Sequence, residues 1–346
     1  MILVTGGAGF IGSHIVAQLI DAGHAVRVLD RAAGPAPAGA ERVHGDVRDP
    51  DAVRRALPGV TAVCHQAAMV GLGTRFDDVT SYVSHNGHGT AVLLCELAAR
   101  GFGGRLVLAS SMVVYGEGRY RCASHGVVAA PPRRPKDLAA GRFEPACPRC
   151  AAPLAPMAVP EHAPVDPRNV YAATKLHQEH LAFAFGRERG VSVTALRYHN
   201  VYGPGMPRNT SYCGVAALFA DALAAGRPPA VFEDGRQLRD FVHVRDVARA
   251  NVVALTRDEP ARGAYNIASG TPRSVGALAA ALTDAAAGDL RPEVTGRFRL
   301  GDVRHVFASA RKAAAELGFV ATEDFAAGIA ELAGVTFGLR PRTVPA

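Results

Sequence analysis

The sequence predicts an α/β fold in which a parallel sheet is wound on both faces by helices. Three observations predict it: an apolar run that begins at Met1, a glycine-rich turn directly after that run, and strand and helix patterns that alternate through the first 200 residues. Alternation of this kind favours parallel strands, because each helix carries the chain back across the sheet. With 346 residues, 49% of them hydrophobic, the chain is long enough to bury a large core.

The first predicted strand runs into a turn that is typical of phosphate binding. Glycines stand at positions 6, 9 and 12, and an apolar helix pattern follows them. We expect Gly6 to turn sharply off the strand, Gly9 to let the backbone approach a pyrophosphate, and Gly12 to pack the helix against the sheet. Phe10 and Ile11 begin that helix, whose N-terminus offers unpaired N–H groups and a positive dipole end to the phosphates.

The second predicted strand, residues 25–29, ends in an acidic residue. Asp30 stands 18 residues after Gly12, where a carboxylate can accept hydrogen bonds from the adenosine ribose and repel a 2′-phosphate. Arg31 follows Asp30 and weakens this preference for a cofactor without a 2′-phosphate. The glycine turn and this acid together predict a bound dinucleotide, and NAD in preference to NADP.

The later elements extend the sheet and then give way to a smaller lobe. We expect strands at 60–65 and 105–111 and helices at 91–99 and 171–187. After Tyr202 the pattern changes to short helices and irregular segments. The predicted division is a dinucleotide-binding domain of residues 1–202 plus about 241–265, a substrate lobe of 203–240 plus 266–346, and an insert at 118–160.

A catalytic group is predicted on the helix that begins near Tyr171. Lys175 lies four residues after Tyr171, on the same helix face, so its ammonium and an oxidised nicotinamide would both favour the phenolate form and lower the tyrosine pKa from about 10. A phenolate can take a proton from a substrate hydroxyl while a nicotinamide takes the hydride. Ser110 and Ser111 end a predicted strand, where ligands bind in such sheets, and a serine there can hold the same substrate oxygen.

The insert carries the spacing of a metal site. It contains eight prolines between Pro131 and Pro160, with CxxH at Cys122–His125 and CxxC at Cys147–Cys150. One histidine and three cysteines predict a closed, structural zinc site. A disulfide is less favoured in a reducing compartment, and unliganded cysteines in a disordered loop are the alternative. The other cysteines lie in apolar contexts that indicate the core: Cys64, Cys95 and Cys213.

Several motifs together resemble the extended short-chain dehydrogenase/reductases that act on nucleotide sugars. They are TGGAGFIGSH near the start, GDV at 45–47, HQAA at 65–68, NGHGT at 86–90, LRYHNVYGPG from Leu196, RDFVHVRDVA from Arg239 and GDVRH from Gly301. The Cys/His insert resembles that of a subgroup described as dTDP-L-rhamnose 4-epimerase-like.

This resemblance implies a Rossmann-type sheet and assigns roles to individual residues. The implied catalytic residues are Ser111, Tyr171 and Lys175. The implied further NAD contacts are Asp46, Val47, Gln66, Ala67, Ala68, Asn86, Tyr171 and Lys175. The implied substrate contacts are Ser111, Met112, Tyr171, Asn200 and Phe232, with Arg239 and Arg304 on the diphosphate.

The two residues that follow Ser111 indicate which of the family's reaction types fits this chain. Family members that dehydrate or decarboxylate carry acids there, and the 3,5-epimerase/reductases carry a cysteine, whereas this chain has Met112 and Val113. Neither side chain can move a proton, which favours a 4-epimerase that acts through a 4-keto intermediate. His199 could be an extra acid but is more often structural in such a context.

Alternatives in substrate and class remain open at this point. The favoured substrate is a dTDP-6-deoxyhexose; a UDP-hexose or UDP-uronate 4-epimerase, a 4-keto-sugar reductase and an NAD-binding redox sensor are the alternatives. The net charge of +7 is spread along a chain without tryptophan, which disfavours a nucleic-acid partner. The sequence contains no run of 18 apolar residues, as a membrane span would require, so we expect a cytoplasmic protein. The resemblance implies a homodimer.

Overall fold

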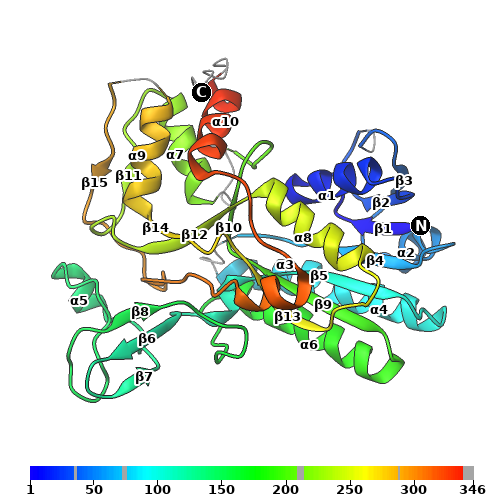
Figure 1. Ribbon diagram of the computed structural model, residues 1–346, viewed down its shortest axis with the longest axis horizontal. Helices are drawn as coiled ribbons and strands as arrows, with labels where there is room; N and C mark the ends of the chain where they lie inside the picture. The colour runs from blue at the N-terminus through cyan, green and yellow to red at the C-terminus, as the bar shows by residue number, and fades with distance from the viewer. Residues whose placement is uncertain (35–36, 72–75, 209–213, 287–288, 338–346) are drawn as a thin grey trace.

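The protein is built on a seven-stranded parallel sheet, seen here in a computed structural model that describes residues 1–34, 37–71, 76–208, 214–286 and 289–337 (Figure 1). The strand order is β13-β9-β5-β4-β1-β2-β3, and every neighbouring pair is parallel. This arrangement confirms the predicted α/β sheet. The strands are β1 (Ile2–Thr5), β2 (Val26–Asp30), β3 (Glu41–His44), β4 (Ala62–His65), β5 (Arg105–Ser111), β9 (Ser192–Tyr198) and β13 (Gly263–Ile267).

Helices cover both faces of this sheet. One apolar core joins the sheet to α1 (Phe10–Asp21), α8 (Val244–Thr256) and the π-helical turn η4 (Ala313–Leu317). A second core joins the other face to α2 (Pro50–Ala56), α4 (Gly89–Ala99) and α6 (Val170–Arg189). The central strands are buried on both sides, as β5 illustrates, and this explains their nearly continuous apolar sequence. Short elements complete this domain: η1 (Phe76–Asp78), α3 (Val79–Tyr82), η2 (Val83–His88) and η3 (Met112–Tyr115).

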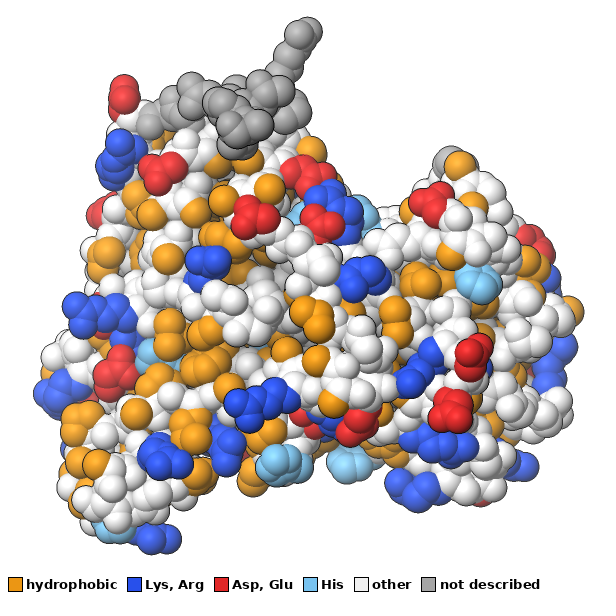
Figure 2. Space-filling view, viewed as in Figure 1, with side chains coloured by type: hydrophobic (Ala, Val, Ile, Leu, Met, Phe, Trp, Pro, Cys, Tyr) orange, Lys and Arg blue, Asp and Glu red, His pale blue; other side chains and the backbone are white. Residues whose placement is uncertain are grey.

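A smaller lobe packs beyond the carboxyl ends of the strands. Its three-stranded sheet has the order β10-β12-β14 and lies against three helices, with Phe241, Leu278 and Ile329 in their shared core. In Figure 2 the face is hollowed between this lobe and the domain that carries α1 and β2, and basic and acidic side chains are interspersed over it. The lobe comprises β10 (Asn200–Tyr202), α7 (Val215–Ala224), β11 (Ala230–Val231), β12 (Leu238–His243), β14 (Pro272–Ser274), α9 (Val275–Ala285), β15 (Glu293–Val294) and α10 (Phe325–Phe337).

The insert folds as a separate small unit below this lobe in Figure 1. Its antiparallel sheet has the order β7-β6-β8, and one short helix follows β7. Its apolar core is small, with five buried residues: Tyr120, Cys122, Ala130, Cys147 and Leu154. The elements are β6 (Arg119–Cys122), β7 (Gly126–Val128), α5 (Pro135–Ala139) and β8 (Ala155–Met157).

The chain crosses between the two main units more often than the sequence indicated. β12 starts in the small sheet, and Ala313, Leu317 and Phe319 return to the core of the large sheet although they follow residue 266. The placement of Cys95 in the core was wrong, because α4 turns Leu93, Leu94 and Leu97 inward and Cys95 outward. Cys64 is buried, and Cys213 lies outside the described residues.

No helix in the described part of the chain combines the length and the apolar character needed to cross a membrane.

Candidate active site

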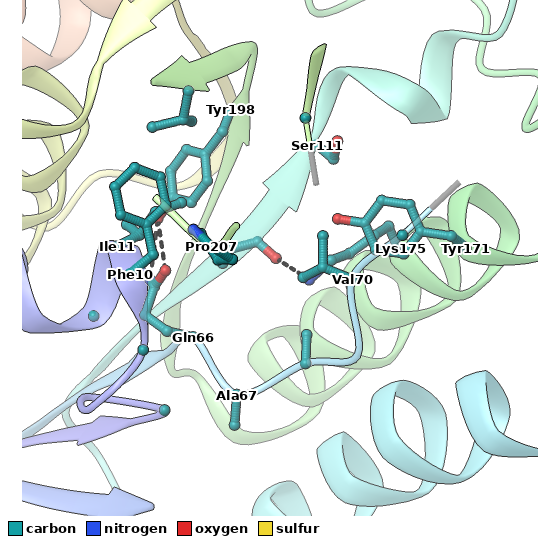
Figure 3. Close-up of a pocket in the computed structure, with 18 of the residues that line it drawn as sticks. Phe10, Ile11, Gln66, Ala67, Val70, Ser111, Tyr171, Lys175, Tyr198 and Pro207 are labelled. Atoms are coloured by element: carbon teal, nitrogen blue, oxygen red, sulfur yellow. Dashed lines mark hydrogen bonds between the residues drawn. The ribbon is translucent and has the colours of Figure 1, made fainter. Parts of the chain in front are cut away.

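A cavity of about 600 Å³ lies at the carboxyl ends of the sheet strands, between the large domain and the smaller lobe. Its walls come from the β1–α1 turn, the ends of β2, β4, β5 and β9, the first turns of α6, and α7. Residues far apart in the sequence, such as Phe10, Tyr171 and Pro207, therefore lie around one space (Figure 3). Parallel sheets bind ligands at this edge.

The glycine turn forms one wall of this cavity. Gly6 has φ +71°, and a Cβ there would meet the Ala67 backbone nitrogen at 2.7 Å. A Cβ on Gly12 would lie only 2.1 Å from the Gly6 carbonyl oxygen. Gly12 therefore packs the helix against the turn itself, whereas the sequence predicted a contact with the sheet. Gly9, Phe10 and Ile11 line the cavity beside it at the N-terminus of α1.

Acidic residues line the adjacent wall. The Asp30 carboxylate accepts hydrogen bonds from the backbone N–H groups of Ala8 and Ala32, both at 2.9 Å, which fixes it beside the glycine turn. Asp46 is held by Arg48 through two side-chain bonds, and this pairing lowers the pKa of Asp46 to about 2. Arg31 and Val47 also line this wall, with the Arg31 guanidinium 3.9 Å from Asp46.

The segment after β4 forms another part of the cavity wall. Gln66, Ala67 and Ala68 line the cavity, and the Gln66 amide donates to the Tyr198 hydroxyl at 3.0 Å. Asn86, in contrast, is fully buried and does not line it. Its amide bridges the backbone N–H and C=O of Met69 and the Thr174 hydroxyl, so it holds this segment against α6 instead.

Ser111, Tyr171 and Lys175 meet at the cavity, as Figure 3 shows. The Asn169 side chain caps α6 by accepting from the N–H of Ala172, which sets the start of the helix next to β5. The Lys175 ammonium lies 6.0 Å from the Tyr171 ring centroid and donates to the Ala109 carbonyl at 3.0 Å. The four-residue spacing of Tyr171 and Lys175 on α6 therefore does bring these two side chains together.

The expected fall in the tyrosine pKa is not produced by the protein without a bound nicotinamide. Burial raises the pKa of Tyr171, which outweighs the hydrogen bond with Ser111 that lowers it. Burial also lowers the pKa of Lys175 to about 8, so the ammonium is itself poorly solvated. The lysine does not suffice to produce a phenolate; a further positive charge in the cavity is needed for that.

The two serines at the end of β5 have different environments. Ser110 donates to the Glu179 carboxylate, which also accepts two bonds from Arg197 in a buried ion pair. Ser111 lines the cavity beside Tyr171, and its hydroxyl also accepts a long bond from the Val113 N–H, at 3.4 Å. Ser111 is therefore the serine that is available to a ligand.

Of the predicted substrate contacts, Met112 and Asn200 line the cavity together with Ser111 and Tyr171. The Asn200 amide oxygen is buried and has no hydrogen-bond partner among the described residues. His199 is buried as well, and burial lowers its pKa to about 4, which favours the neutral ring near pH 7.

The remaining three predicted contacts lie away from the cavity wall. Phe232 is flanked by the guanidinium groups of Arg297 and Arg299, at 5.0 and 4.9 Å from its ring centroid. Arg239 donates to backbone carbonyls of residues 238, 303 and 304. Arg304 is fully buried, and carboxylates accept from all five of its N–H groups, which leaves no donor for a diphosphate in this arrangement. Their assignment to the substrate remains a prediction.

The four predicted metal ligands form one cluster. Their ligand atoms all lie within 4.8 Å of one another. The Cys122 Sγ is 3.6 Å from Cys150 Sγ and 3.5 Å from His125 Nδ1, which is also 3.5 Å from Cys147 Sγ. A tetrahedron with bonds of about 2.3 Å to sulfur and 2.0–2.1 Å to nitrogen has edges of about 3.6–3.8 Å. The sulfurs are too far apart for a disulfide.

Several residues that line the cavity were not predicted from the sequence. Tyr198, Met206 and Pro207 belong to or follow the LRYHNVYGPG motif, so that motif could have indicated them. Val215 and Ala216 on α7 and Phe241 on β12 carry no local signal, because only the packing of the lobe brings them to the cavity.

Comparison with known proteins agrees with this site. The model of the NAD dependent epimerase/dehydratase family matches residues 2–135 and 151–268. The chain belongs to this family. The unmatched residues 136–150 between those ranges lie in the insert and include two of the four cluster cysteines. The chain is an enzyme of the isomerase class, a nucleotide-sugar 4-epimerase that uses NAD.

Individual relatives align with 80% or more of the chain. It is 33% identical to dTDP-L-rhamnose 4-epimerase of Burkholderia thailandensis, over 96% of this chain and 93% of the relative. It is 32% identical to a putative UDP-glucose 4-epimerase of Methanocaldococcus jannaschii, over 80% of each. Among solved structures, it is similar to UDP-glucose 4-epimerase of Thermus thermophilus in complex with NAD, with a TM-score of 0.76, 30% identity and coverage of 97% and 99%.

Proposed function

We propose that the protein interconverts the C4 epimers of a dTDP-6-deoxyhexose, a sugar of the L-rhamnose kind, with NAD as its resident cofactor. The observation that carries the 4-epimerase chemistry is the meeting of Ser111, Tyr171 and Lys175 next to the glycine turn in one cavity. The sugar and the base are supported by the likeness to the Burkholderia enzyme over almost the entire chain.

The residues present fit NAD. Gly6 and Gly12 let the turn and the start of α1 pack closely, and this packing leaves Gly9, Phe10 and Ile11 at the cavity, where helix N-terminal N–H groups suit a pyrophosphate. The Asp30 carboxylate is fixed by two backbone N–H groups and faces the same cavity, where it can accept from both ribose hydroxyls. When bound, NAD supplies the hydride acceptor and returns the same hydride.

The side chains around the cavity move the proton and hold the sugar. Ser111 donates to the C4 oxygen of the sugar and Tyr171 accepts the hydroxyl proton, so that loss of this proton and of the C4 hydride gives a 4-keto sugar. The positive charge of the nicotinamide ring and of Lys175 favours the phenolate that this step requires. Once the keto sugar has rotated to present its other face, Tyr171 returns the proton. A hydride from the bound cofactor would then reach that face, which would give the epimer without net oxidation.

Met112 and Val113 limit the reaction to this one position. Both are apolar side chains in the turn η3 directly after Ser111, and Met112 lines the cavity. They supply neither the second acid nor the second base that removal of water across C5–C6 requires. This favours epimerisation over dehydration.

The test is a panel of dTDP- and UDP-sugars followed by NMR of the products. We expect the C4 epimer of a dTDP-6-deoxyhexose to form without added cofactor. If no sugar in the panel epimerises although NAD is retained, the proposal is wrong.

A UDP-hexose or UDP-uronate is the second candidate substrate. It is favoured by the relatives named as UDP-glucose 4-epimerases and by the fold shared with MoeE5 in complex with UDP-glucuronic acid and NAD, which has a TM-score of 0.78 and 31% identity over 97% of this chain. The same panel separates the two. A reductase would consume reduced cofactor with each turnover, whereas an epimerase would not. A redox sensor would not need the assembled catalytic residues.

We also propose that the insert holds one structural zinc ion on Cys122, His125, Cys147 and Cys150. The cluster distances fit a closed tetrahedral shell, which leaves no position for a substrate. The apolar cluster around the site has five buried residues, two of which are these cysteines, so a metal must supply much of the order of the insert. Metal analysis of the purified protein should find one zinc per chain. Cys150→Ser should lose it, whereas Cys95→Ser, an exposed cysteine outside the cluster, should retain it.

A homodimer and a cytoplasmic location remain predictions. Light scattering of the purified protein tests the first, and fractionation of cells tests the second.

A further inference from the structure

The contact between the insert and the substrate lobe contains a partly buried network of charges. Glu144 of the insert accepts from Arg304 Nε at 2.9 Å and Nη2 at 2.6 Å through one oxygen, and from His305 Nε2 at 2.9 Å through the other. The His305 Nδ1 accepts from the Leu238 N–H at 3.1 Å, so a neutral ring already has the proton on Nε2 that this bond needs. One carboxylate of the insert thus holds two consecutive residues of the lobe.

Further parts of the insert fix the same segment. The Tyr120 hydroxyl accepts from the His305 N–H at 3.1 Å, and Tyr120 stands two residues before Cys122 on β6. Arg133 of the insert donates to the Asp302 carbonyl at 2.6 Å and pairs with Glu233 of the lobe at 2.8 Å. The side chains of Arg133 and Glu233 are 5% and 3% exposed, so this ion pair is shielded from water and from salt.

The segment so held continues into the wall of the cavity. Val306 forms a parallel bridge with Arg239 on β12, and the Val306 N–H donates to the Leu238 carbonyl. β12 in turn pairs with β10, with Phe241 opposite Asn200, and both of these residues line the active-site cavity. A continuous series of hydrogen bonds therefore joins the insert to the substrate side of the cavity.

We propose that the insert is a metal-ordered clamp on the substrate lobe, and that Glu144 is the positioning residue through which it acts. When the cluster holds its ion, β6 and the chain around Glu144 are fixed, and residues 303–306 keep β12 in its place. Without the ion the small insert core cannot hold these residues against their conformational entropy, so the segment loosens. The predicted result is weaker binding of the nucleotide part of the substrate, with cofactor binding unchanged. The nucleotide part of this proposal rests on the proposed function.

The experiment compares Glu144→Gln with Asp137→Asn in the full-length protein. Glu144 is about half exposed, so its substitution leaves the core intact. Asp137 is a matched control, because it is an acid of the same insert whose arginine partners, Arg134 and Arg142, are also in the insert. Two readouts are needed: hydrogen exchange of peptides that span 303–306, and titration with dTDP and with UDP. Wild-type protein stripped of metal by a chelator is measured in parallel.

We expect Glu144→Gln to keep its zinc and its NAD, to exchange faster at 303–306, and to raise the dissociation constant of the nucleotide roughly fivefold or more. The metal-stripped wild type should show the same changes, and Asp137→Asn should show neither. Unchanged exchange at 303–306 in Glu144→Gln would overturn the proposal, as would equal loosening in Asp137→Asn. If neither nucleotide binds the wild type, the proposed function fails, while the exchange measurement still decides whether the clamp exists.

Discussion

Gly12→Ala is the sharpest test of the cofactor site, because the added atom has no room. Its Cβ would lie 2.1 Å from the Gly6 carbonyl oxygen and 2.9 Å from the Gly7 Cα, whereas real Cβ atoms essentially never approach within 3.0 Å. The helix start and the turn must therefore separate by roughly 0.9 Å, since both contacts are backbone atoms that cannot rotate away. Overpacking of this kind costs about 1–3 kcal/mol.

The displaced turn should also lose part of its contact with the cofactor. One charge-assisted hydrogen bond to a phosphate is worth about 1.5–3 kcal/mol, which corresponds to roughly a ten- to hundredfold weaker affinity. We therefore expect the variant to be purified with little NAD, measured by absorbance after denaturation, and to unfold at a lower temperature.

Gly103→Ala provides the control for this measurement. A Cβ at Gly103 meets nothing within 4 Å, and its φ is not in the left-handed region, so the same chemical change should be harmless there. If Gly12→Ala retains wild-type NAD content and thermal stability, the packing argument for the glycine turn is refuted.

Three further predictions concern catalysis, cofactor choice and pH. Tyr171→Phe should lower kcat by about 10²–10⁴-fold while NAD content is unchanged, as followed by NMR of the epimers; turnover near the wild-type rate would contradict the assigned base. Asp30→Ala should narrow the preference for NAD over NADP in competitive binding, and a wild type that prefers NADP would show that Asp30 does not select the cofactor. Lys175 has a pKa lowered by burial from 10.5 to about 8, so the unfolded chain binds the extra proton between these values and stability rises with pH there. Relative to Lys175→Met, the wild type should gain up to about 3 kcal/mol of unfolding free energy across that window, measured by urea denaturation; a constant difference would contradict the buried position of the ammonium.

The sequence alone was sufficient to predict features that depend on residues close together in the chain. The turn after β1 needs glycine at Gly6 because φ is positive there, and at Gly12 because a side chain has no space, so both positions are readable from the sequence. The spacing of Tyr171 and Lys175 places them on one helix face, and the short spacing within each Cys/His pair of the insert fits a metal knuckle. The fold class and the family followed from such signals, and so did the prediction of a dinucleotide site.

Only the tertiary structure decided the roles of residues whose partners are distant in the chain. Arg304 meets Glu144 across 160 positions and Glu233 across 71, so its five donors are taken by carboxylates that no local pattern connects with it. The pKa of Tyr171 rises because several elements bury its ring, although the adjacent lysine alone predicts a fall. Burial and long-range pairing depend on how the lobe, the insert and the sheet pack, and the cost of removing a charge or a phenol from water is set by that packing.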